Sequence, residues 1–159
     1  MLAHTIHPIP TVGATAPAFE LPSTGGTTID LASFRGRRPV LIAFFPLAFT
    51  STCTKELCSF TEDYNQFAGT GTAILPISVD STATLKEYKA KLGLSVDLLS
   101  DFKREVSARY GVLNLEKYYS NRSYFLIDKT GIVRWAHVEE MNGNRRENSE
   151  ILARIAQLG

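Results

Sequence analysis

The sequence predicts an α/β fold in which a mixed central β-sheet is flanked by helices on both faces. Short apolar runs alternate along the chain with amphipathic segments, which is typical of strands separated by helices. Residues 39–45 are apolar without alternation, so we expect a central strand that is buried on both faces. Residues 123–138 have the pattern of a β-hairpin, which would add antiparallel strands to the same sheet.

The remaining elements follow from apolar spacing and from residues that begin or end helices. Residues 52–68 predict a helix, because apolar side chains recur at helical spacing and Gly69 can end it. Residues 81–93 predict another, with Ser81 as its N-cap and Gly93 as its end. The other predicted elements are a hairpin over 16–34 that turns at Gly25 and Gly26, a buried strand over 72–80, a short helix over 101–111, a turn at 128–131, and a last helix from Asn144 with Glu147 in its capping box.

Length and composition predict a single domain over residues 1–159, with 1–12 as a loosely ordered N-terminal segment. A chain of this length can bury roughly 70% of its unfolded surface. Apolar residues make up 44% and charged residues 21%, as in an ordinary soluble globular protein. The net charge is +1 and the basic residues are scattered, so we expect no nucleic-acid partner. The pairs Arg37–Arg38 and Glu139–Glu140 are interpreted as solvated surface.

The sequence predicts a cytoplasmic protein with no membrane partner. Its start has neither the basic nor the apolar region of a secretory signal. The longest apolar run, 39–49, contains a proline and is too short to span a bilayer. Two cysteines give neither a disulfide framework nor four-ligand zinc spacing, and we expect no cofactor and no metal.

The chain has two cysteines, Cys53 at the start of the predicted helix over 52–68 and Cys58 five residues further along it. A helix N-terminus offers unpaired N–H groups and the positive end of a dipole, which favour a thiolate, the nucleophilic form of cysteine. On a helical projection Cys53 falls within the apolar stripe, whereas Cys58 lies roughly 135° from its centre. The alternative interpretation is that both are inert small residues of the core.

The segment Pro46–Cys53, PLAFTSTC, matches the P-x-x-x-T-x-x-C motif and resembles the peroxiredoxins, thiol peroxidases with a thioredoxin-like fold. The string FFPLAFT is most similar to the one-cysteine AhpE group. Further blocks occur in the family's order: LLSDF, YGV and NRSYFLIDKTGIVRWA. The resemblance covers nearly the whole chain from about Gly13 and implies a thioredoxin-like fold and peroxidase activity.

The resemblance implies a role for each matching residue. Cys53 would be the peroxidatic cysteine, which attacks a peroxide and becomes a sulfenic acid. Thr50 would bind the peroxide through its hydroxyl, and Pro46 would shield the pocket from water. Arg122 would stabilise the thiolate and the charge on the departing oxygen. Glu56 would orient that arginine.

Each of these residues has a structural interpretation as well. Arg122 fits a surface charge at the start of a strand, and Pro46 fits the end of one. Thr50 fits a helix cap, for which Thr52 is an equal candidate, and Glu56 fits capping of the first turn. The histidines are scattered and indicate no catalytic or ligand role: His4, His7 and His137.

Cys58 departs from the AhpE-like pattern and stands where the PrxQ group, the bacterioferritin comigratory proteins, has its resolving cysteine. The predicted function is therefore reduction of hydrogen peroxide and organic hydroperoxides, with a Cys53–Cys58 disulfide as the expected resolution. The expected reductant is thioredoxin or another small thiol, and a homodimer through loops near the active site is expected around Phe49. The alternatives are a one-cysteine peroxiredoxin, a peroxide sensor, or a disulfide oxidoreductase, which C-x-x-x-x-C spacing disfavours.

Overall fold

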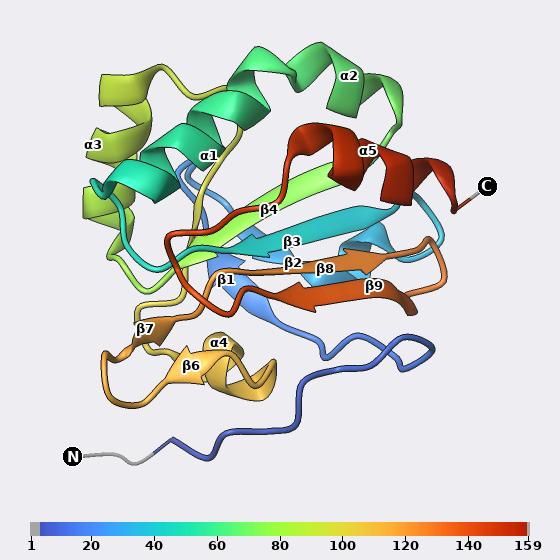
Figure 1. Ribbon diagram of the computed structural model, residues 1–159, viewed down its shortest axis with the longest axis horizontal. Coiled ribbons are helices and arrows are strands. Elements are labelled where there is room, and N and C mark those ends of the chain that lie inside the picture. The colour runs from blue at the N-terminus through green and yellow to red at the C-terminus, as the bar shows by residue number, and fades with distance from the viewer. Residues whose placement is uncertain (1–3, 159) are drawn as a thin grey trace.

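A computed structural model describes residues 4–158, and its core is a five-stranded mixed sheet (Figure 1). β4 and β5 run parallel to the central strand β3, whereas β8 runs antiparallel to β3 and pairs with β9. This arrangement confirms the predicted mixed sheet. In spatial order the strands are β5 (Leu99–Ser100), β4 (Ala73–Ser78), β3 (Val40–Phe44), β8 (Ser123–Ile127) and β9 (Val133–Val138).

Strand β3 is buried along its whole length, as its unbroken apolar sequence predicts. Successive side chains of a strand point to opposite faces. Leu41 and Ala43 accordingly enter one core cluster, while Ile42 and Phe44 enter a second cluster on the other face. The strand thus joins two hydrophobic cores and delivers the chain to the segment that follows Phe44.

Four helices cover the first face of the sheet (Figure 1). The predicted continuous helix over 52–68 is wrong, because the helix breaks at Asp63, whose φ of −98° and ψ of 16° are not helical. Asp63 Oδ2 there accepts a hydrogen bond from Asn148 Nδ2 at 2.8 Å. The helix over 81–93 is confirmed with Ser81 as its N-cap. The four are α1 (Ser51–Glu62), α2 (Tyr64–Gly69), α3 (Thr82–Leu92) and α5 (Asn148–Ala156).

The second face is covered by the N-terminal hairpin and two short helical segments. The hairpin and the short helix after residue 101 are confirmed. A two-residue ladder, β6 with β7, was not predicted because so short a strand leaves no periodicity to detect. These elements are β1 (Glu20–Pro22), β2 (Thr28–Asp30), η1 (Leu31–Phe34), α4 (Glu105–Arg109), β6 (Leu113–Asn114) and β7 (Tyr119–Ser120).

Helix α5 begins later than the sequence predicts. Its first residue is Asn148 rather than Asn144, and Glu147 occupies the N-cap position without a side-chain capping bond. The residues before it have other partners: Arg146 N donates to Tyr124 Oη at 3.0 Å. Tertiary bonds therefore hold 144–147 in an extended loop that a capping-box sequence alone would have made helical.

The N-terminal segment lies along α4 and the small ladder (Figure 1). Residues 4–11 form no helix or strand, but His7 N donates to Ala108 O at 3.0 Å. Gly111 permits this approach, because a Cβ there would lie 2.5 Å from His7 O. Within residues 4–158 no helix is both long enough and apolar enough to cross a bilayer.

Replacing Gly111 by Ala tests how firmly this segment is held. Gly111 has a φ of +73°, a left-handed conformation that alanine adopts only with strain. The added Cβ would also clash with the backbone of His7. Gly93 is the matched control, because its φ of +63° is similar and a Cβ would meet no atom within 4 Å. We expect Gly93→Ala to cost about 1–2 kcal/mol of unfolding free energy, and Gly111→Ala to cost clearly more. Equal losses in urea denaturation, with unchanged amide exchange at His7, would show that the segment is not fixed there.

Candidate active site

The candidate site begins where β3 ends, in the loop that leads into α1. Cys53 lies in the first turn of α1 and is 1% exposed, packed in the first core cluster. Cys58, one and a half turns later, is only partly buried. This difference agrees with the helical projection. Both cysteines are free in the structure, so the helix presents two separate thiols, one of them at the positive end of the helix dipole.

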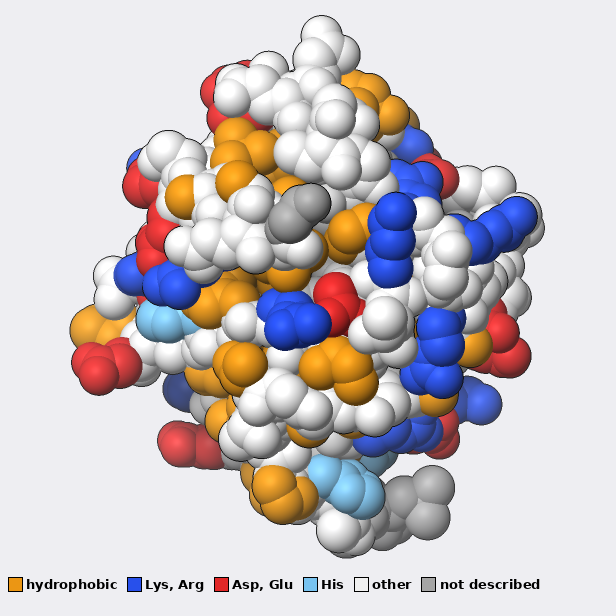
Figure 2. Space-filling model, turned by 90° about the vertical axis from the view of Figure 1, so that its right-hand side faces the viewer, with side chains coloured by type: hydrophobic (Ala, Val, Ile, Leu, Met, Phe, Trp, Pro, Cys, Tyr) orange, Lys and Arg blue, Asp and Glu red, His pale blue; other side chains and the backbone are white. Residues whose placement is uncertain are grey.

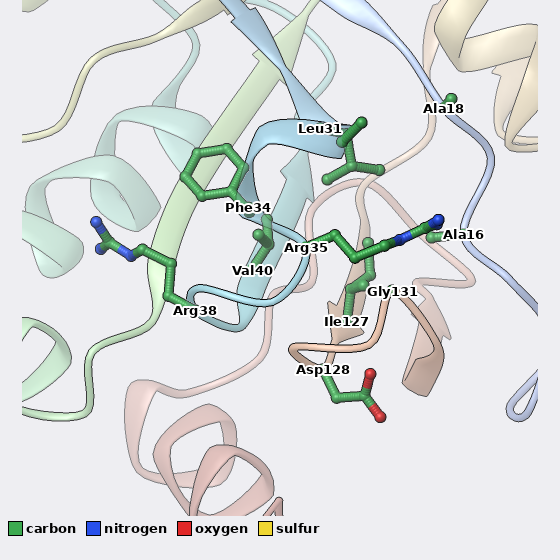
Figure 3. Close-up of a pocket in the computed structure, with 11 residues that line it drawn as sticks. Ala16, Ala18, Leu31, Phe34, Arg35, Arg38, Val40, Ile127, Asp128 and Gly131 are labelled. Atoms are coloured by element: carbon green, nitrogen blue, oxygen red, sulfur yellow. The ribbon is translucent and has the colours of Figure 1, made fainter.

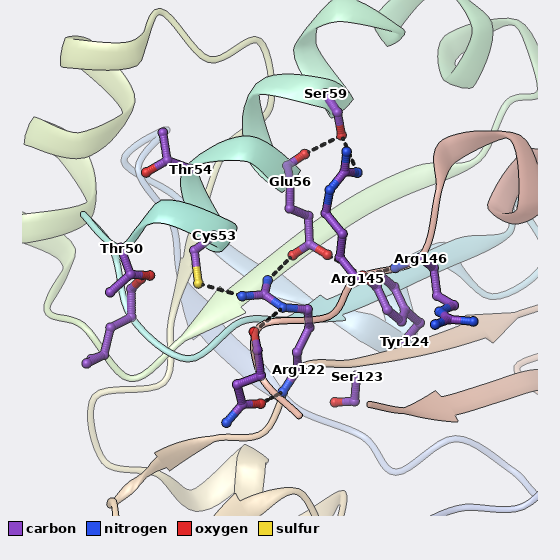
Figure 4. A network of polar contacts seen from close by, with 12 residues as sticks. Thr50, Cys53, Thr54, Glu56, Ser59, Arg122, Ser123, Tyr124, Arg145 and Arg146 are labelled. Atoms are coloured by element: carbon purple, nitrogen blue, oxygen red, sulfur yellow. Dashed lines mark hydrogen bonds and ion pairs between the residues drawn. The ribbon is translucent and has the colours of Figure 1, made fainter. Parts of the chain in front are cut away.

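Arg122 places a guanidinium directly against the Cys53 sulfur (Figure 4). Its Nη2 donates to Cys53 Sγ at 3.0 Å. Arg122 precedes β8 and is 1% exposed, so the surface-charge interpretation is wrong. Burial alone would lower the pKa of Arg122, but the charges of Glu56 and Cys53 oppose it and raise that pKa, so the group stays cationic. A permanent cation with a directed N–H therefore faces the thiol.

Glu56 pairs with this arginine from the next turn of α1. Its Oε1 accepts from Arg122 Nη1 at 2.7 Å, and its Oε2 accepts from Tyr124 Oη. The carboxylate is buried and faces the sheet, so it does not cap the first turn. Burial raises the pKa of Glu56, whereas Arg122 and the Tyr124 hydroxyl act to lower it. A buried ion pair results, in which each charge depends on the other.

Thr50 and Pro46 lie in the loop before the helix. Thr50 holds the N-cap position but makes no side-chain capping bond; its hydroxyl instead donates to Leu47 O at 2.8 Å. It is exposed, while Pro46 is buried. Between them Phe49 has a φ of +64° and packs on Tyr88 with 4.7 Å between ring centroids. The loop therefore turns sharply and leaves the Thr50 side chain at the surface beside the first turn of α1.

The loop 139–147 supplies further partners that sequence reasoning missed. Asn142 contacts Arg122 twice: its Oδ1 accepts from the backbone N at 2.8 Å and its O accepts from Nε at 3.3 Å. Glu139 is buried rather than solvated, since it pairs with Arg146 at 2.5 Å and with His137 at 2.9 Å. A buried carboxylate needs such partners. No local pattern marks Asn142, because its partner Arg122 lies twenty residues back along the chain.

Elsewhere the described residues form pockets, such as one of about 510 Å³ lined by Ser100, Asp101 and Glu105, but no metal site. No group of three or more His, Cys, Asp and Glu side chains among residues 4–158 could hold a metal ion. Figure 2 shows basic and acidic side chains interspersed on one face, with hydrophobic ones between them. A small cavity of about 30 Å³ lies beneath η1 (Figure 3), but it belongs to the second core, across the sheet from Cys53.

Comparisons with known proteins show the family to which the chain belongs. Residues 12–136 match the model of the AhpC/TSA family. Alkyl hydroperoxide reductase E of Mycobacterium tuberculosis is 39% identical over 131 residues, which are 81% of this chain and 86% of that protein. Peroxiredoxin Q, chloroplastic, of Oryza sativa subsp. japonica is 36% identical over 79% of this chain and 58% of its own length. Putative peroxiredoxin bcp of Coxiella burnetii is 36% identical over 77% of this chain and 84% of its own.

Solved structures show the same architecture. The reduced 2-Cys peroxiredoxin of Plasmodium vivax superposes with a TM-score of 0.85 at 32% identity, covering 92% of this chain and 81% of that one. Peroxidoxin BcpB of Mycobacterium tuberculosis gives a TM-score of 0.83 at 28% identity, covering 93% and 97%. These likenesses confirm the thioredoxin-like fold that the sequence resemblance implied.

The buried ion pair predicts a large stability loss in Arg122→Met. At pH 7 this variant should lose about 3–5 kcal/mol of unfolding free energy, because Glu56 is left charged, buried and without its cation. The double variant Arg122→Met/Glu56→Gln also removes the Glu56 charge, so it should recover most of the lost unfolding free energy. Arg134→Met is the control: its pair with Asp128 is as short, 2.6 Å, but Arg134 is 57% exposed, so the expected loss is within about 1 kcal/mol.

The loss in Arg122→Met should shrink on acidification. Burial already raises the pKa of Glu56 above its ordinary 4.5, and removing Arg122 raises it further. The unfavourable charge is present above that raised pKa, diminishes as the pH falls through it, and is gone below 4.5, where the unfolded chain also protonates. Denaturant curves at several pH values measure this. A loss that is independent of pH would show that packing, not the Glu56 charge, is responsible.

Proposed function

The chain belongs to the AhpC/TSA family and is a peroxiredoxin, a thiol-dependent peroxidase, and we propose that Cys53 is its peroxidatic cysteine. One observation carries this proposal: Arg122 Nη2 lies 3.0 Å from the buried Cys53 sulfur at the start of a helix. A guanidinium and a helix N-terminus both favour the thiolate. Cys58 lacks both in this structure, since it lies in the middle of α1 and is partly exposed.

In the proposed reaction the Cys53 thiolate attacks one oxygen of the hydroperoxide. The S–O bond forms as the O–O bond breaks, so the sulfur is oxidised to a sulfenic acid and the peroxide is reduced. The departing oxygen leaves as hydroxide or alkoxide and takes a proton to become water or an alcohol. Arg122 can donate to the oxygens in the transition state from a position that is already fixed, which is the most effective form of electrostatic stabilisation.

Thr50 and Pro46 are proposed to hold and shield the peroxide. Because the Thr50 hydroxyl gives its proton to Leu47 O, its free lone pairs can accept the O–H of a hydroperoxide. Pro46 is buried and has no N–H, so it can close the pocket without offering a competing donor. Hydrogen peroxide and organic hydroperoxides are the proposed substrates, and a cytoplasmic location is the proposed setting.

Cys58 is proposed to resolve the sulfenic acid as an intramolecular disulfide, with loss of water. Two residues five apart in a helix lie some 8–9 Å apart at Cα, beyond the roughly 7 Å that a disulfide tolerates. The first turns of α1 must therefore unwind before Cys58 can reach Cys53. Thioredoxin or another small thiol is the proposed reductant, and a homodimer through loops around the exposed Phe49 is proposed as well. If Cys58 does not react, an external thiol resolves Cys53 directly.

Cys53→Ser tests the nucleophile. We expect this variant to lose peroxide consumption while its circular dichroism and melting temperature stay close to those of the wild type, because serine is nearly the same size. Cys58→Ser is the matched control and should still react once with one equivalent of peroxide. Consumption of peroxide by Cys53→Ser at the wild-type rate would refute the assignment.

Cys58→Ser tests the resolution step. After one equivalent of peroxide the wild type should lose the mass of two hydrogen atoms and become less helical, with faster amide exchange over 52–60. The variant should instead gain one oxygen, stay helical and over-oxidise more readily. Lys55 lies between the cysteines, so trypsin separates them unless a disulfide links the two peptides. If wild type and variant accumulate the same sulfenic acid, Cys58 is a bystander.

A further inference from the structure

The Arg122 guanidinium is held at three of its nitrogens, each with a different acceptor. Nε donates to Asn142 O at 3.3 Å, Nη1 to Glu56 Oε1 at 2.7 Å and Nη2 to Cys53 Sγ at 3.0 Å. Because the group is planar and rigid, the first two bonds determine where Nη2 points. The alignment of Nη2 with the sulfur therefore depends on where the Glu56 carboxylate lies.

The second oxygen of that carboxylate is fixed by a tyrosine. Glu56 Oε2 accepts a hydrogen bond from Tyr124 Oη, and Tyr124 Oη in turn accepts from Arg146 N at 3.0 Å (Figure 4). A phenol has one proton. Since the Arg146 amide already supplies the proton of one bond, the phenol proton must point to Glu56. Burial raises the pKa of Tyr124, so the hydroxyl keeps this proton at neutral pH.

The tyrosine ring is itself firmly placed. Tyr124 is 0% exposed and stacks on Trp135 of the neighbouring strand, with 5.8 Å between ring centroids and 20° between planes. It follows Arg122 by two residues, so both side chains leave the same face of the chain toward α1. Tyr124 and Arg122, two residues apart in the chain, thus bond to the two oxygens of the same Glu56 carboxylate.

We propose that Tyr124 is a positioning residue for the peroxidase reaction, which holds Glu56 so that Arg122 Nη2 stays directed at the Cys53 sulfur. The proposal rests on the proposed role of Cys53 as nucleophile. The charged groups that face Glu56 are Arg122, just before β8, and Arg145 from the loop before α5, and both remain when only the tyrosine hydroxyl is removed. The expected effect is therefore on orientation rather than on net charge.

The first test compares Tyr124→Phe with Tyr110→Phe. Both changes remove one buried hydroxyl and keep the ring, but Tyr110 Oη donates to Pro17 O at 2.7 Å in the second core, across the sheet. The measurement is the rate of Cys53 oxidation by hydrogen peroxide, by rapid quench, alkylation and peptide mapping, over a pH series. At the pH plateau, where the thiol is fully ionised, Tyr124→Phe should be slower by at least about tenfold, and Tyr110→Phe should match the wild type within about twofold.

The second test is a double-mutant cycle with Glu56→Gln. If Tyr124 acts through Glu56, adding Tyr124→Phe to Glu56→Gln should change the plateau rate by less than about twofold. This pair of variants stays informative if Tyr124→Phe alone folds poorly, because no buried carboxylate then loses its donor. An equal slowing in both backgrounds, or a plateau for Tyr124→Phe like that of Tyr110→Phe, overturns the proposal. A separate assay of peroxide consumption by Cys53→Ser distinguishes this failure from failure of the proposed function, which consumption at the wild-type rate would indicate.

Discussion

The burial of one positive charge, that of Arg122, is the constraint on which the arrangement of this protein depends. A guanidinium that is 1% exposed cannot be stable unless its donors are satisfied, because water no longer hydrates it. The acceptors come from α1 and from the loop 139–147, which are far apart in sequence. The sheet brings them together, with β8 next to β3 at its centre. The Cys53 sulfur is one of these acceptors. The same hydrogen bond therefore helps to satisfy the buried guanidinium and places a donor against the thiol.

Helix α1 has to be regular to position Cys53, yet it has to unwind for the proposed disulfide to form. As a regular helix it holds Cys53 in its first turn and keeps Cys58 out of bonding distance. Its C-terminal end is tied to α5, since Asn148 Nδ2 donates to Ser59 O at 3.0 Å and to Asp63. Its N-terminal end rests on the loop that contains the left-handed Phe49. The proposed unwinding therefore has to break the bonds that Cys53 and Glu56 make with Arg122, while the other end keeps the helix attached to the core.

Short-range sequence patterns, such as apolar runs and helix-end residues, predicted the fold well. The unbroken apolar run at 39–45 predicted β3, and Ser81 with Gly93 predicted the ends of α3, because propensity and tertiary structure agree there. The predicted start of the last helix at Asn144 was wrong, because a hydrogen bond from Arg146 N to Tyr124 overrides the local capping signal. The motif around Cys53 indicated the chemistry, but Asn142 and Tyr124 had no local signal. Their importance arises only when distant segments meet, which neither spacing nor composition records.

The loop 139–147 also sets when the site can exist. A chain leaves the ribosome from its N-terminus, so Cys53 and α1 emerge well before β8 and this loop. Until β8 is made, β3 has a neighbour on one side only, and the partner that faces the sulfur, 69 positions further along, has not been synthesised. A nascent chain that has not reached residue 122 therefore holds Cys53 without its guanidinium. The thiol gains its directed donor only after Arg122 and the loop 139–147, whose Asn142 holds it, have been made.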